Sequence, residues 1–169
     1  MTDEQTPPEG EPTPVNRVVS VWDDVVADME ATAEELRAEG FAVLEVHPGD
    51  VAAMEGREGH RWGLDVLVPD NEFPEIERLV EEEGHEFDAC RVFRAEAKGL
   101  ALFVVAMLDE DGDQALVFPA YYDKHDGQKV LEKANEEGEM RTHLRPLDER
   151  TVVTFTQDDP SLFEPEHPI

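Results

Sequence analysis

The sequence predicts an α+β fold in which about three helices pack on a mostly antiparallel sheet of about seven strands. Residues 87–122 carry this expectation, because three apolar segments follow one another there with only short turns between them, as in an antiparallel meander. Residues 16–84 instead have the order helix, strand, strand, helix, which leaves room for parallel pairing and hence for a mixed sheet. A chain of 169 residues is long enough for one domain with its own core.

We expect a single globular domain over residues 15–156, with a tail on each side of it. Residues 1–14 are acidic and rich in proline, and residues 157–169 are also acidic and contain several prolines. Such segments cannot bury enough apolar surface to offset the entropy lost on ordering. Both tails are therefore expected to be disordered.

The first half of the domain begins with the segment "NRVVSVWDDVVADMEATAEELRAEG", in which apolar residues recur at three- and four-residue spacing up to Gly40. This pattern predicts a long amphipathic helix with a glycine stop. Residues 41–47 and 64–69 are apolar segments of strand length, separated in part by the glycine-broken segment 55–63. A second amphipathic helix is expected over about 70–84, ending at a glycine.

The second half contains the meander "FDACRVFRAEA", "LALFVVAML" and "QALVFPAYY". Its turns are expected at Lys98-Gly99 and at "DEDGD", and its middle strand is apolar on both faces, so that strand should lie inside the sheet. A third helix is predicted from about Asp126 to Glu137. Two short strands, "MRTHLRPL" and "TVVTFT", follow it.

The formal net charge of −28 is the most pronounced feature of the composition. Disorder does not explain it, because amphipathic periodicity and aliphatic segments persist through the middle of the chain. Halophilic adaptation does, because the Debye length falls to about 3 Å in molar salt and self-repulsion is then screened. On this interpretation the acidity describes the habitat and says little about partners.

The composition also indicates a compartment. The single cysteine, Cys90, excludes an internal disulfide framework and fits a reducing cytoplasm. The first residues lack the cationic and apolar regions of a signal peptide, and no apolar run approaches the length of a membrane span. We expect a cytoplasmic protein without a membrane segment.

The segment "FPAYYDKHDGQK" holds both tyrosines and lies where a strand passes into the third helix. Amides at a helix N-terminus favour an anion, and the side chains around it would form the wall of an anion site. The wall residues would be Tyr121, Tyr122, Lys124 and His125. The alternative is that one tyrosine packs inward and the other covers the rim.

The strand "MRTHLR" places Arg141, His143 and Arg145 on one face, because side chains alternate along a strand. Met140 and its apolar neighbours must pack inward, so the cationic face is expected to point outward. It could hold a phosphate, a carboxylate ligand or an acidic segment of a protein partner. The alternative is an ordinary solvent face paired with carboxylates across the sheet.

The segment "GREGHRWG" offers a third cationic group on a glycine-rich hinge. Arg57 and Arg61 could contact an anionic group, with Trp62 as a lid. The alternative is a loop whose arginines pair with surface carboxylates. The three groups together favour a non-catalytic module that binds an anionic small molecule or a protein partner.

A metal-dependent hydrolase of nuclease type is the alternative function, and the sequence leaves open whether the protein is an enzyme. Glu96 and Lys98 form a Glu-x-Lys element, and Asp65 on an earlier strand could share a magnesium ion with Glu96. Two details object. Lys98 falls at a predicted turn, and a whole helix separates the two strands.

No cofactor or metal site is expected from the motifs. The histidines lack HxxxH or HExxH spacing, Cys90 has no CxxC partner, and the "DEDGD" segment does not match a calcium-binding loop. We also expect no nucleic-acid partner, since electrostatic affinity for phosphates falls steeply with salt and no base-stacking motif compensates.

The segments from "WDDVVADMEATAEELRAEGFAVLEVHPGDVAA" to "VFPAYYDKHDGQKVLEKANEEGEMRTHLRPLDERTVVTFTQDDPSLF" resemble a conserved haloarchaeal protein family of unknown function. The resemblance spans roughly residues 16–165. It implies a halophilic, cytoplasmic protein, but it implies no reaction, cofactor or site residue.

Overall fold

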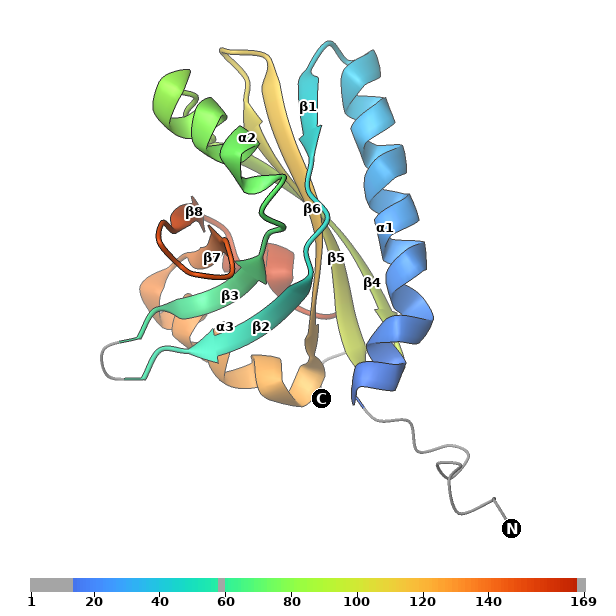
Figure 1. Ribbon diagram of the computed structural model, residues 1–169. Helices are drawn as coiled ribbons and strands as arrows, with labels where there is room; N and C mark the ends of the chain where they lie inside the picture. Colours follow the sequence, from blue (N-terminus) through green and yellow to red (C-terminus); the bar gives the residue numbers. More distant parts are fainter. Residues whose placement is uncertain (1–13, 58–59, 167–169) are drawn as a thin grey trace.

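The computed structural model of the protein describes residues 14–57 and 60–166, which form two mixed four-stranded sheets and three α-helices (Figure 1). This confirms the predicted α+β class, with eight strands in two sheets where about seven in one sheet were expected. In chain order the elements are α1 (Pro14–Ala38), β1 (Ala42–Glu45), β2 (Asp50–Glu55), β3 (Trp62–Leu67), α2 (Phe73–Glu77), η2 (Arg78–Glu82), β4 (Ala89–Ala97), β5 (Leu100–Asp109), β6 (Gln114–Asp123), α3 (Lys124–Glu137), β7 (Met140–Arg145), β8 (Val153–Gln157) and η3 (Pro160–Phe163).

The first sheet has the order β1-β6-β5-β4 and contains the predicted meander. β5 lies inside the sheet as expected, and β1 pairs with β6 in parallel, which makes the sheet mixed. α1 covers one face of this sheet (Figure 1), and Met29 and Leu36 of α1 belong to the same buried cluster as Leu102 and Val104 of β5. The amphipathic stripe of α1 is thus explained by a sheet face that it shields from water.

The second sheet has the order β2-β3-β7-β8, with β3 and β7 parallel. Its inner face packs on the other face of the first sheet, where Leu64 and Leu144 join Phe103 and Phe118 in one core. The sequence did not predict β2, because "DVAAME" contains a single β-branched residue and little alternation. Pairing with β3 supplies what its own propensity lacks.

The turn between β4 and β5 forms as expected, with both Lys98 (φ 56°) and Gly99 (φ 80°) in the left-handed region. A two-residue hairpin turn of this kind matches the twist of the strands. The second helix is shorter and less regular than predicted, because α2 passes into the single π-helical turn η2. Phe73, Ile76 and Leu79 are nonetheless buried on the predicted face.

The C-terminal segment departs from the prediction of a tail beginning at residue 157. Phe163 is fully buried, with its ring centroid 5.7 Å from that of Phe103, and its carbonyl accepts a hydrogen bond of 2.5 Å from the Tyr122 hydroxyl. Gln157 thus belongs to β8 and Pro160–Phe163 form η3, although residues 157–169 are rich in proline and acidic residues. The tail expected at 1–14 falls almost wholly, and residues 167–169 wholly, outside the described residues.

Candidate functional site

At the junction between β6 and α3, the N-terminus of α3 is capped by a carboxylate of the protein itself. Asp123 is the N-cap of α3, and its carboxylate accepts from the His125 amide (2.9 Å) and from the Arg17 guanidinium (2.6 Å). Burial alone would raise the pKa of the Asp123 carboxyl. The hydrogen bonds from Arg17 and from the His125 amide have the larger combined effect and hold this pKa below its usual range. The helix N-terminus therefore already has its negative partner.

The four residues expected to form an anion-binding wall point in different directions. Tyr122 is buried between the sheets, whereas Tyr121 is half-buried on the α1 side of β6. Lys124 forms an ion pair with Glu96 of β4, and His125 is exposed. This arrangement matches the alternative to an anion-binding wall, in which one tyrosine packs inward and the other covers the rim.

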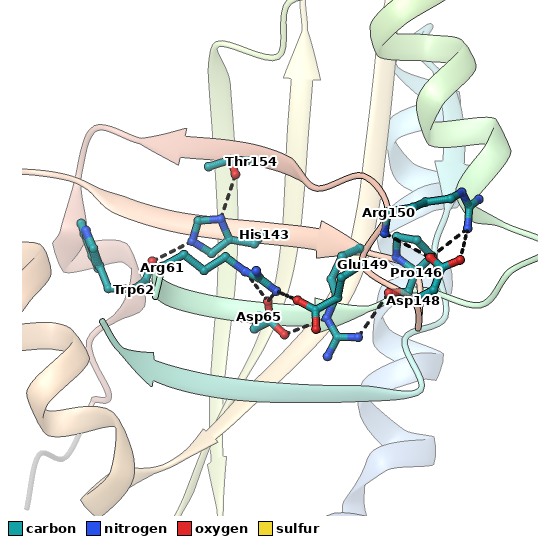
Figure 2. Close-up of polar contacts among 10 residues, drawn as sticks. Arg61, Trp62, Asp65, His143, Pro146, Asp148, Glu149, Arg150 and Thr154 are labelled. Carbon is teal, nitrogen blue, oxygen red and sulfur yellow. Dashed lines mark hydrogen bonds and ion pairs between the residues drawn. The ribbon is translucent and has the colours of Figure 1, made fainter. Parts of the chain in front are cut away.

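Asp65 organises the outer face of the second sheet. Its side chain is only 5% exposed, and one carboxylate oxygen accepts from Arg61 Nε and Nη2 at 2.8 and 2.6 Å. Its other oxygen accepts from Arg145 Nε at 3.0 Å. Figure 2 shows Arg61 reaching both Asp65 and Glu149, the second contact at 2.8 Å. Two of the predicted anion-binding arginines are therefore neutralised by carboxylates of the chain.

His143 was expected to face solvent, and this is wrong, since the residue is 4% exposed. β7 lies between β3 and β8, and the imidazole is held across both neighbours by the Thr154 hydroxyl on Nδ1 (2.8 Å) and the Trp62 carbonyl on Nε2 (2.7 Å; Figure 2). Burial is the main cause that lowers the pKa of His143. The neutral ring then donates from Nε2 and accepts at Nδ1.

The remaining cations of the predicted groups lie at the surface. Arg141 stacks over Trp62, with 4.9 Å between the guanidinium carbon and the ring centroid, and also pairs with Glu139 at 2.8 Å. Arg57 is exposed on the segment between β2 and β3. These groups do not share a cavity with the β6–α3 junction, whose lining contains none of them.

The nuclease-type alternative requires Asp65 and Glu96 to share an ion. Asp65 lies on β3 of the second sheet with two arginines, while Glu96 lies on the edge strand β4 of the first sheet with Lys124. Lys98 donates to the Ser20 hydroxyl at 2.8 Å. The structure does not bring these side chains together into one metal site.

One group of possible metal ligands occurs among the described residues. Glu30, Glu45 and His47 place ligand atoms within 4.8 Å of one another, although Arg37 already pairs with Glu45 at 2.9 Å. Glu72 binds His47 Nδ1 at 2.8 Å. Partial burial opposes protonation of the ring, yet the surrounding carboxylates raise the pKa of His47. The His47 ring therefore lies between the carboxylates of Glu30 (3.6 Å) and Glu72 (2.8 Å), which favour its protonated form.

Cys90 offers no nucleophile. Burial raises the pKa of its thiol to about 12, so the thiolate is absent near neutral pH.

A cavity of about 720 Å³ is lined by residues 18–23 of α1, by β2 and by the β6–α3 junction. Its apolar lining includes Trp22 and Tyr121, which meet edge to face with 5.7 Å between ring centroids and 76° between planes. The Tyr121 hydroxyl donates to Asp50 at 3.4 Å. Five carboxylates line the same cavity, namely Asp23, Asp50, Glu55, Asp123 and Asp126. Among the residues that the structure describes, no lysine or arginine lines it.

Sequence reasoning missed most of this cavity. Trp22 falls within the segment predicted as a long amphipathic helix, and the strand that supplies Asp50 was not predicted. Tyr121 was identified, but with cationic neighbours in place of carboxylates. The signal that could have found the site is the pairing of an aromatic with an aspartate one residue later, Trp22-Asp23, on an otherwise amphipathic helix.

Comparisons with known proteins identify a family but no activity. No curated protein and no solved structure matches the chain. Within the part of the chain that the structure describes, no helix is long and apolar enough to cross a membrane. One family model matches residues 9–165, and the chain therefore belongs to a family of unknown function (DUF7529).

Proposed function

We propose that the protein is a non-catalytic binding module whose site is the cavity between α1, β2 and the β6–α3 junction. The single observation that supports this function is a concavity of about 720 Å³ that combines an aromatic pair with charged groups. Ligand sites are typically clefts of about 300–1,000 Å³ with a mainly apolar lining and a few polar groups. The inert thiol of Cys90 and the separation of Asp65 from Glu96 favour binding over catalysis.

The charge of the lining favours a cationic ligand over the anionic one that the sequence suggested. The cavity is lined by carboxylates, whereas Arg61, Arg145 and Lys124 are engaged by Asp65 and Glu96. Binding of an anionic small molecule or protein partner at Arg57, Arg141 or Lys124 stays a prediction. The experiment below tests it alongside the cavity.

We also propose that the protein comes from a haloarchaeon and works in a salty cytoplasm. The net charge of −28 supports this, because such self-repulsion is tolerated best where salt screens it. The single cysteine is consistent with a reducing compartment.

The chain has two tryptophans, which allows the cavity to be monitored selectively. Trp62→Phe leaves Trp22, on α1, as the only tryptophan, and this residue lies in the proposed site. Trp22→Phe is the matched control, because it leaves only Trp62, which lies on β3 of the second sheet. We would titrate both variants with four classes of small molecule, namely amines, neutral alcohols, carboxylates and phosphates. The proposal expects saturable fluorescence changes from Trp22 and none from Trp62.

Two results would count against it. A response of Trp62 alone, to phosphate or carboxylate, would move the site to the face that carries Arg141. If Trp22 fluorescence did not change with any of the four classes at 100 mM, the cavity would not be a small-molecule site.

A further inference from the structure

We infer that the ligand of the cavity is an organic cation with a substituted ammonium group, held between the aromatic pair and the carboxylates. The inference rests on the proposed function and deepens it by naming the chemical class. Three independent features of the cavity support it.

The first feature is the aromatic pair itself. Trp22 and Tyr121 are half-buried, meet in a T-shaped contact and both line the cavity. The face of an aromatic ring carries negative charge, so it attracts a cation placed within about 6 Å of the centroid. Trp22 gives the stronger interaction of the two, because tryptophan is the best cation–π partner.

The second feature is the charge that remains after the internal ion pairs are counted. Arg17 engages Asp123 at 2.6 Å, and Lys129 approaches Glu55 at 3.9 Å. No basic side chain among the described residues forms an ion pair with the other three carboxylates of the lining, which are Asp23, Asp50 and Asp126. The cavity therefore keeps a negative charge that a cationic ligand would neutralise.

The third feature separates an organic cation from a simple metal ion. Val18, Val51 and Ala53 line the cavity together with the aromatic rings. A hard metal ion binds through oxygen ligands and gains nothing from such apolar surface, whereas the methyl groups of a substituted ammonium are desolvated favourably against it. The described residues also form no metal-ligand cluster in this cavity.

Choline and its uncharged isostere 3,3-dimethyl-1-butanol provide the test, because they have nearly the same shape and differ in charge. We would titrate each into the full chain by calorimetry, with ionic strength held constant by KCl. We expect choline to bind and the alcohol to bind at least tenfold more weakly. Trp22→Leu should weaken choline about fivefold or more, and Asp50→Asn should weaken it as well.

Trp62→Phe is the matched control and should leave choline affinity unchanged, because Trp62 lies outside the cavity lining. Circular dichroism establishes that each variant is folded, and Asp50→Asn keeps the test valid should Trp22→Leu unfold. Equal affinity for choline and the alcohol would overturn the inference while leaving the proposed function intact. Binding of neither, with Trp22 responding only to carboxylates or phosphates, would overturn the inference in the same way. Silence of Trp22 towards every class would remove the proposed function too.

Discussion

Asp65 is a buried charge whose role is structural. Because its carboxylate is nearly inaccessible and both oxygens accept from guanidinium groups, Asp65→Asn leaves Arg61 and Arg145 without their common partner. We expect a loss of about 1.5–3 kcal/mol in the free energy of unfolding, the usual range for hydrogen bonds to charged groups. Urea denaturation measures it.

Asp148→Asn is the control, since Asp148 is 64% exposed and forms a surface ion pair with Arg150. We expect a change within about 0.5 kcal/mol there. Equal effects of the two substitutions would contradict the structural role of Asp65.

His47 and His143 should titrate on opposite sides of the usual histidine pKa of about 6.5. Carboxylates raise the pKa of His47, so the stability it contributes is fully present below about pH 6.5 and is lost as the pH rises through its folded-state pKa. Burial lowers the pKa of His143, so its contribution is present above about pH 6.5 and is lost as the pH falls through its folded-state pKa.

Ring-proton NMR, with His47→Gln and His143→Gln for assignment, measures both pKa values directly. We expect His47 to titrate above, and His143 below, the usual histidine pKa of about 6.5. A measured pKa of His143 at or above about 6.5 would contradict its burial as a neutral ring.

At the scale of elements, α3 approaches β6 closely because residue 127 is glycine. A Cβ at Gly127 would lie 2.2 Å from a ring carbon of Tyr122, whose hydroxyl also anchors the C-terminal segment through the Phe163 carbonyl. At an exposed helix position, replacing glycine by alanine stabilises the helix. At Gly127 we expect the steric clash with Tyr122 to outweigh this gain. We expect Gly127→Ala to cost about 1–3 kcal/mol, measured by thermal unfolding.

Gln128→Ala is the neighbouring control, exposed on the same helix, and should change stability by less than about 0.5 kcal/mol. Gly127→Ala that is neutral or stabilising would show that α3 and Tyr122 are less tightly packed than described.

The elements differ in how well the sequence predicted them, and the reasons are physical. The meander of β4, β5 and β6 was predictable because its turns and apolar segments are local signals. β2 was not, because its pairing with β3 makes a strand from residues of weak propensity. The alternation along β7 correctly put His143 on the face opposite Met140, but it could not reveal that Trp62 and Thr154 would enclose the ring.

The candidate site was less predictable than the fold for a related reason. Its cavity joins Trp22 of α1 to Asp50 of β2 and Tyr121 of β6, which only the tertiary arrangement brings together. Local patterns identified cations, since they are rare in this chain. They could not show that Asp65 and Asp123 would already hold three of the arginines.

At the scale of the whole molecule, the net charge of −28 should make stability depend on salt. Raising KCl from 0.15 to 1 M shortens the Debye length from about 8 to 3 Å and screens the repulsion among carboxylates. The same salt weakens surface ion pairs, but these contribute only about 0–1 kcal/mol each. We expect the melting temperature to rise by several degrees, with most of the gain below 1 M.

A scanning calorimetry series in KCl checks this. A melting temperature that stays constant or falls over the same range would contradict the halophilic interpretation. That result would not bear on the proposal that the cavity is a binding site.

The most direct test of the central proposal, that the cavity is a binding site, is a two-dimensional amide NMR titration of the full chain with choline and with 3,3-dimethyl-1-butanol. The proposal expects saturable shifts confined to the first turns of α1, to β2 and to the start of α3, with larger effects from choline. Shifts that are absent from these elements, or that gather instead on β7 around Arg141, would contradict it.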